Sequence, residues 1–104
     1  MAIGILSLHI IFHSCNSLKE KRSLLKPLLY HIHKEFNVSI AEMDLLDKWI
    51  DSIIAVSLIS NNHNHTQSEL NAVISLMQKH FRKIEILENH IELLYSKNQL
   101  IFLE

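Results

Sequence analysis

Residues 52–60, Ser-Ile-Ile-Ala-Val-Ser-Leu-Ile-Ser, are apolar on both alternating faces. In an extended strand successive side chains point to opposite sides, so a half-buried strand alternates between apolar and polar residues. A strand that is apolar on both sides is typical of the centre of a sheet, where both faces are covered. We therefore expect residues 52–60 to form a central strand.

Residues 2–12 show a second strongly apolar strand pattern. Taken alternately, they place one wholly apolar set on one face, and the opposite face is mixed. The apolar set is Gly4, Leu6, Leu8, Ile10 and Phe12, and the mixed set is Ile3, Ile5, Ser7, His9 and Ile11. Shorter or less regular patterns predict two more strands, over 38–43 and over 84–95, the latter with an irregularity near Asn89.

Two amphipathic helices separate these strands. Ser17 followed by Glu20 matches a capping box and predicts a helix over 17–36, with a bend around residues 23–27 because Pro27 lies inside it. Its expected core stripe is Leu18, Leu25, Leu29, Ile32 and Phe36, with Leu28 beside it. After the asparagines of residues 61–64, a second helix is predicted to about Lys83. Its stripe is Leu70, Val73, Ile74, Met77 and Phe81.

The resulting order is βαββαβ. Two split βαβ units in this order predict a ferredoxin-like α+β fold: a four-stranded antiparallel sheet with both helices on one face. The first and third strands are central in that topology, and they are the two most apolar strands here. We expect one ferredoxin-like domain over residues 1–95. Residues 96–104 form a C-terminal extension, read as an extra strand or an interface segment.

Composition excludes several classes of protein. The 104 residues contain one cysteine, so no intramolecular disulfide can form, and the formal net charge is −1. Gly4 is the only glycine, which rules out a glycine-rich phosphate loop and a dinucleotide-binding fingerprint. The apolar N-terminus is too short to span a membrane and lacks the features of a signal peptide. We expect a cytoplasmic protein that needs no cofactor and does not bind a membrane.

Three segments together resemble a known family. They are Ser17-Leu18-Lys19-Glu20-Lys21-Arg22, then residues 36–44 running into Asp47 and Trp49, and residues 57–61. They resemble the YlxP-like family of small bacterial proteins, catalogued as a domain of unknown function, over residues 1 to about 95. The resemblance implies a ferredoxin-like fold and, because family genes often lie beside translation genes, a link to ribosomal RNA or a translation factor. Where Leu45 and Leu46 stand the family often has His or Gln, which argues against a polar role for this loop.

The first helix carries a basic strip that includes an aromatic residue. Cations spaced along one helix flank can contact successive phosphates, so this strip is a candidate RNA or partner-binding site. The plainer alternative is a solvated flank whose side-chain stems cover the edge of the core. The strip comprises Lys19, Arg22, Lys26, Tyr30 and Lys34. Base stacking on the sheet is not expected, because the outward face of the first strand offers Ile3, Ile5, Ser7, His9 and Ile11, and the third strand has no aromatic residue at all.

The loop after the second strand is a second candidate contact, through Asp44, Asp47 and Trp49. Nearby carboxylates could hold Mg²⁺ or act as acid and base, but no positioned nucleophile accompanies them, so an interface role is preferred. Among the eight histidines, only His63 and His65 are close enough in sequence to share a metal ion, and zinc wants three or four ligands. We predict no metal site and no catalytic residues, and an enzyme ranks below a binding module.

Surplus apolar residues predict self-association. If the helices cover one face of the sheet, the other exposes Ile3, Ile5 and Ile11 together with one set from the third strand. That set is either Ile53, Ala55 and Ile59 or Ile54, Val56 and Leu58. Leu100, Ile101 and Phe102 could add to the same contact, pair as an edge strand, or do both, and a homodimer is favoured. Two functional classes remain: an accessory module that contacts ribosomal RNA or a translation factor, and a protein-interaction or small-ligand regulatory module without a nucleic-acid role.

Overall fold

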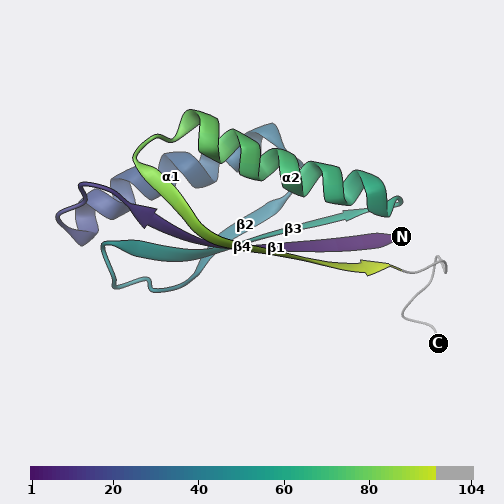
Figure 1. The fold of residues 1–104 in the computed structure, drawn as a ribbon, viewed down its shortest axis with the longest axis horizontal. Helices are drawn as coiled ribbons and strands as arrows, with labels where there is room; N and C mark the ends of the chain where they lie inside the picture. The colour runs from purple at the N-terminus through teal and green to yellow at the C-terminus, as the bar shows by residue number, and fades with distance from the viewer. Residues whose placement is uncertain (96–104) are drawn as a thin grey trace.

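The computed structural model describes residues 1–95, which form four strands and two helices in the order βαββαβ (Figure 1). The elements are β1 (Ala2–Phe12), α1 (Leu18–Glu35), β2 (Ser39–Asp44), β3 (Asp51–Ser60), α2 (His63–His80) and β4 (Ile84–Tyr95). The strands lie in the order β2-β3-β1-β4, and every neighbouring pair is antiparallel. The predicted ferredoxin-like fold is confirmed. The proposed extension, with Leu100, Ile101 and Phe102, lies outside the described residues.

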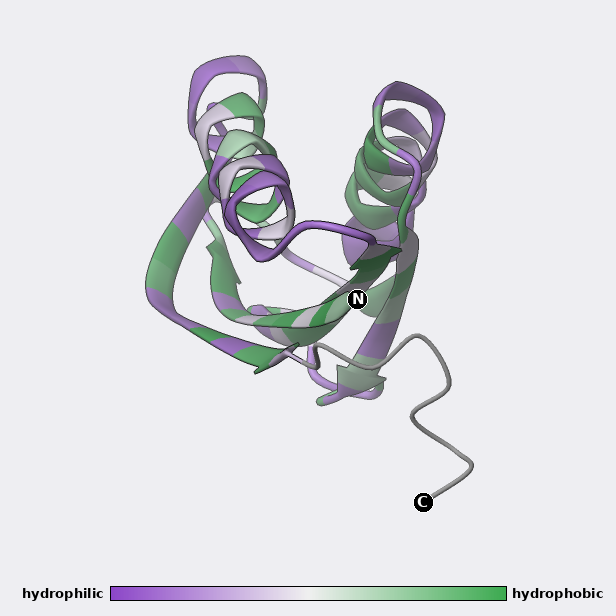
Figure 2. Ribbon diagram, turned by 90° about the vertical axis from the view of Figure 1, so that its right-hand side faces the viewer, coloured by the Kyte–Doolittle hydropathy of each residue, from purple (hydrophilic) through white to green (hydrophobic). Residues whose placement is uncertain are grey.

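Both helices lie on the same side of the sheet, as the end-on view shows (Figure 2). The strands β1 and β3 are central, as predicted, but only one face of each is covered. On β3 the side chains of Ile54 and Val56 are fully buried, whereas that of Ile59 is 64% exposed. The expectation of a strand covered on both sides is therefore wrong within one chain, because two crossover connections of the same hand place both helices on one face.

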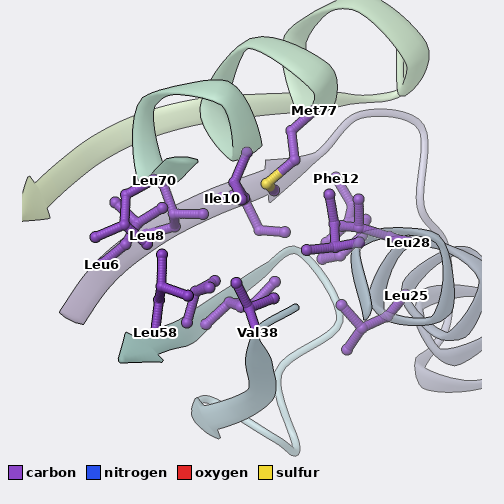
Figure 3. Packing of buried hydrophobic residues seen from close by; sticks show 14 of the residues in the cluster. Leu6, Leu8, Ile10, Phe12, Leu25, Leu28, Val38, Leu58, Leu70 and Met77 are labelled. Atoms are coloured by element: carbon purple, nitrogen blue, oxygen red, sulfur yellow. The ribbon is translucent and has the colours of Figure 1, made fainter. Parts of the chain in front are cut away.

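The core lies between this face and the helices, and it joins residues from β1, β3 and both helices (Figure 3). The buried side of α1 is turned slightly from the predicted stripe. Leu25, Leu28 and Ile32 are buried, whereas Leu29 and Phe36 are only half-buried. The fourth buried residue of this helix is Lys21, which the apolar pattern did not reveal. A helix wheel locates an apolar arc, but contact with the sheet decides which part of that arc is buried.

Side-chain caps explain where the helices begin. The Ser17 hydroxyl accepts a hydrogen bond from the Glu20 amide at 3.0 Å, and the Glu20 carboxylate accepts one from the Asn16 amide at 3.1 Å. The predicted start at Ser17 is confirmed, and α1 continues through the exposed Pro27. The α2 cap is Asn62, whose side chain accepts from two backbone amides. This helix ends at His80, three residues earlier than predicted.

Gly4 allows α2 to approach β1 closely. A Cβ atom at this position would lie 2.5 Å from Thr66 Cγ2 and 2.7 Å from Leu70 Cδ1, both on α2. Either distance is too short for two carbon atoms without displacement. The only glycine of the chain is therefore required for packing between β1 and α2 rather than for a turn.

A β-bulge interrupts the pairing of β1 with β4. The register shifts between His9 and Ile10, whose partners on β4 are Glu88 and Ile86, so Leu87 is the extra residue. The irregularity predicted near Asn89 is thus confirmed, two residues earlier in the chain. Leu87 is 54% exposed, as expected for a bulged residue at the edge of a sheet.

Candidate interaction surfaces

The basic strip lies on the solvent side of α1. Lys19, Arg22, Lys26, Tyr30 and Lys34 are all exposed, and the Tyr30 side chain is 68% exposed. Lys19, Arg22, Ser23 and Lys26 together border a shallow hollow. Within residues 1–95, none of the four cations of the strip forms an ion pair. The strip therefore presents positive charge that is not neutralised by the described part of the chain.

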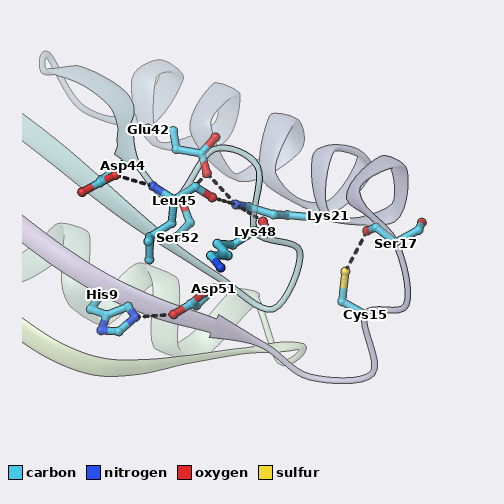
Figure 4. Close-up of polar contacts among 10 residues, drawn as sticks. All are labelled: His9, Cys15, Ser17, Lys21, Glu42, Asp44, Leu45, Lys48, Asp51 and Ser52. Atoms are coloured by element: carbon cyan, nitrogen blue, oxygen red, sulfur yellow. Dashed lines mark hydrogen bonds and ion pairs between the residues drawn. The ribbon is translucent and has the colours of Figure 1, made fainter.

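Lys21 lies on the opposite side of the same helix and is 1% exposed. Its ammonium group lies 2.8 Å from the Glu42 carboxylate of β2, and it donates to the backbone carbonyls of Leu45 at 2.7 Å and Lys48 at 2.6 Å (Figure 4). The hydroxyl of buried Ser52 donates to the same carboxylate. All three N–H groups of the lysine are thus satisfied, as a buried cation requires.

These bonds hold the loop of residues 45–50, which joins β2 to β3. Leu45 has a φ of 62°, a left-handed conformation that is unfavourable for a bulky residue. Its carbonyl accepts from Lys21, and its amide donates to the Asp44 carboxylate at 2.8 Å. The strained conformation is therefore held from both sides by hydrogen bonds.

The outer side of this loop is apolar. Leu46 is 55% exposed, Trp49 42% and Ile50 54%, and the neighbouring Met43 of β2 is 61% exposed. Trp49 is thus not a core residue, although part of its side chain is covered. An apolar group on a loop fixed from inside is typical of a contact surface rather than of a mobile connection.

The acidic residues predicted around this loop do not form one cluster. Glu42 pairs with Lys21, and Asp51 pairs with His9 at 2.8 Å. Asp44 binds the Leu45 amide, and Asp47 is exposed and forms no ion pair with any residue of 1–95. Within the same range, no three His, Cys, Asp or Glu side chains converge in a way that could hold a metal ion.

The remaining reactive side chains are also separated from one another. The thiol of Cys15 is buried and donates to the Ser17 carbonyl at 3.3 Å, whereas His13 pairs with Glu85 at 3.0 Å. Cys15 and His13 therefore do not form a nucleophile and base pair. The ring of His63 packs against Tyr95, with 4.8 Å between the ring centroids.

The sheet face that the helices leave uncovered is called here the open face. The strand register decides which β3 residues lie on it beside those of β1. The register pairs Ile3 with Ile59 and Ser7 with Ala55, so the set on the open face is Ile53, Ala55 and Ile59. Ile5 is 45% exposed, and Ile3, Ile11 and Ile53 are half-buried. No Phe, Tyr or Trp of β1 or β3 lies on this face, and His9 is its only ring on these two strands.

Most of the chain matches a known protein family. A family model described as a protein of unknown function (DUF503) matches residues 3–91. The chain belongs to this family. The DUF503 relative YlxP of Bacillus subtilis (strain 168), an uncharacterized protein, is 34% identical over 83 residues, which cover 80% of this chain and 89% of YlxP. The predicted resemblance to the YlxP-like family is confirmed.

Solved structures support the fold of this DUF503 chain. The de novo designed protein Foldit4 superposes with a TM-score of 0.52 at 9% identity, over 93% of this chain and all of the design. A second designed protein, with the ferredoxin fold, gives 0.51 at 9% identity over 95% of this chain and 89% of its own. At such identity the likeness concerns the fold alone. Neither of the two described helices is long and apolar enough to cross a membrane.

Proposed function

We propose that this DUF503 protein is an accessory RNA-binding module that contacts the phosphate backbone of ribosomal RNA through the basic strip of α1. The observation that carries the proposal is the exposed, un-neutralised charge of the strip within residues 1–95. At 1.5 Å per residue, the strip from Lys19 to Lys34 is about 22 Å long, enough to follow several phosphates. Tyr30, exposed between Lys26 and Lys34, supplies a ring on which an unpaired base can stack.

The proposed binding mode differs from that of sheet-based RNA modules. The strip lies on the outer side of a helix, and the open face has no Phe, Tyr or Trp on its two central strands. The overall charge of −1 gives no general attraction to nucleic acid, so binding must be local. We place the protein in the cytoplasm, where ribosomal RNA is found and a lone cysteine such as Cys15 stays reduced.

Fluorescence anisotropy with a labelled ribosomal RNA hairpin tests the proposal. Replacing Arg22 and Lys26 together with Glu should abolish binding, because two phosphate contacts become repulsive. The matched control is Lys79→Glu with Arg82→Glu, which makes the same charge change at exposed positions outside the strip. Equal loss in both variants would point to net charge alone, and unchanged binding in the first would remove the strip as the RNA site.

A second candidate function rests on the loop anchored by Lys21. Its exposed Leu46, Trp49 and Ile50 favour a protein partner, such as a translation factor, because aromatic and aliphatic anchors dominate protein contacts. Affinity capture with and without ribonuclease distinguishes the two candidates. Ribosomal material that is lost on ribonuclease treatment and in the Arg22/Lys26 variant supports the RNA module. A defined protein that survives ribonuclease and is lost in Trp49→Ala supports the loop.

A further inference from the structure

We infer that the open face of the sheet is the interface of a homodimer, in which two copies pack face to face about a two-fold axis running along β3. This interface is separate from the α1 strip, which lies on the helical side of the molecule. The inference therefore goes beyond the proposed RNA contact and does not depend on it.

Size is the first argument. A sheet of four strands, with β3 ten residues long, presents an open face on one side. An axis along β3 sets β1 of each copy over β2 of the other and leaves β4 unopposed. With strands about 4.8 Å apart and a rise of about 3.3 Å per residue, β1, β2 and β3 together have a flat projection of roughly 400 Å² per copy. Side chains standing on this face add to its accessible area, so the contact falls at the small end of specific interfaces.

The distribution of residues on the face is the second argument. Apolar side chains lie on β1, β2 and β3, where Ile5, Met43 and Ile59 are exposed by 45%, 61% and 64%. Polar and charged side chains lie at one end of β1 and β3, where His9 pairs with Asp51, and along β4, an edge strand, through Glu88, His90 and Glu92, whose register places them on the same face. Interfaces have an apolar centre and a polar rim, so the contact should centre on β3 with β4 at its margin.

Shape complementarity supplies the third argument. A hollow of about 370 Å³ on the open face is bordered by small residues, among them Ser39, Ala41, Ala55 and Ser57, and by the larger Ile5. Ser57 is the register partner of both Ile5 on β1 and Ser39 on β2, so these three residues lie in one row. Rotation about an axis along β3 carries Ile5 of one copy over the Ser39 side of the hollow in the other. Each copy thus supplies one protruding side chain and one hollow, as a two-fold contact requires.

Sedimentation equilibrium at micromolar concentration tests the inference directly. The wild-type chain should sediment as a dimer, and Ser57→Arg should sediment as a monomer, because two like charges would meet at the axis. Ser57 is exposed in the single chain, so this substitution removes no core contact. The control is His90→Arg on the polar rim, which adds the same arginine beside Glu92 and should leave the dimer intact. A monomeric wild-type chain, or a dimeric Ser57→Arg, would overturn the inference.

A cross-linking experiment tests the position of the axis. Facing sheets lie about 10 Å apart, which a short bis-maleimide can span between equivalent residues near the two-fold axis. Ser57→Cys should give a covalent dimer, whereas Ser75→Cys, exposed on α2, should give none at the same concentration. Cys15 is buried and is not expected to react. Cross-linking of Ser75→Cys without cross-linking of Ser57→Cys would place the contact on the helices instead.

Discussion

The ammonium nitrogen of Lys21 and the carboxylate of Glu42 are 2.8 Å apart, and their side chains are only 1% and 16% exposed. The two residues join α1 to β2 beneath the loop of residues 45–50. Because the lysine also donates to two loop carbonyls, it ties a helix, a strand and a loop together at one atom. Removal of one partner from such a buried pair leaves the other charge without compensation.

Lys21→Met should therefore lower the free energy of unfolding by about 3 kcal/mol, the range found when one partner of a buried ion pair is removed. The variant leaves Glu42 without its ion-pair partner and the Lys48 carbonyl without its donor, and the Leu45 carbonyl keeps only the bond from the Lys48 amide. Urea unfolding followed by circular dichroism measures the change. Lys19→Met, an exposed position on the same helix, should change stability by less than about 0.5 kcal/mol. Equal effects of the two substitutions would contradict the buried role of Lys21.

Trp49 should report the state of the loop in the same variants. It is the only tryptophan of the chain and is 42% exposed. In Lys21→Met the loop loses its inner hydrogen bonds, so iodide should quench Trp49 fluorescence more strongly than in the wild type. Lys19→Met should match the wild type. A quenching constant that does not change in Lys21→Met would show that the loop holds its shape without the lysine.

Gly4→Ala should destabilise the fold by about 1 to 3 kcal/mol, the usual cost of adding a methyl group to a packed core. The added carbon would meet Thr66 Cγ2 at 2.5 Å, so Thr66→Ser, which removes that atom, should recover part of the loss in the double variant. Thermal unfolding of the two single variants and the double variant measures this coupling. Strictly additive effects would mean that the strain is relieved elsewhere.

Asn62→Ala should cost about 1 kcal/mol, the typical effect of removing an N-cap side chain. The Asn62 side chain accepts from the amides of Asn64 and His65 at 2.8 and 3.1 Å. Asn62→Asp keeps the acceptor and adds a negative charge at the helix start, so it should be at least as stable as the wild type. Differential scanning calorimetry distinguishes the three chains, and a loss in Asn62→Asp equal to that in Asn62→Ala would argue against the cap.

Salt dependence should separate phosphate contacts from other RNA contacts. Each phosphate neutralised contributes nearly one unit to the slope of log affinity against log salt, so the four cations of the strip predict a slope of about −3 to −4. Replacing Arg22 with Gln should reduce the magnitude of the slope by about one. Lys79→Gln, outside the strip, should leave it unchanged. Binding that is insensitive to salt would exclude the strip as the source of affinity.

Much of the fold was predictable because local patterns agree with one another. Ser17 and Glu20 mark the start of α1, and alternation along residues 2–12 separates the buried from the uncovered side of β1. The uncovered set on β3 could not be chosen between Ile53 and Ile54 without the register, which depends on pairing between distant segments. Local sequence patterns thus predict the order of the elements, whereas they do not predict the register between strands.

The anchor of the loop was the main feature that sequence reasoning missed. Lys21 stands among the other charged residues of α1 in the sequence, although its spacing from Leu25, Leu28 and Ile32 places it on the buried side. A lysine in line with core residues predicts a buried partner, and Glu42 was available on the inner side of β2, where it pairs with Ile54. The carbonyls that accept from Lys21 could not be predicted from sequence. One of them belongs to Leu45, whose left-handed conformation turns it inward, and no glycine stands there to signal that conformation.

The Lys21 anchor also orders events during folding. Its acceptors lie 21 to 27 positions further along the chain, so before the helix docks only local bonds, from the Leu45 amide to the Asp44 carboxylate and from the Lys48 amide to the Leu45 carbonyl, favour the positive φ of Leu45. Until α1 has docked on the sheet, the Lys48 carbonyl bonds to water, and the left-handed conformation lacks the stabilisation that Lys21 supplies. The loop between β2 and β3 should therefore reach its native form late, after α1 has docked on the sheet.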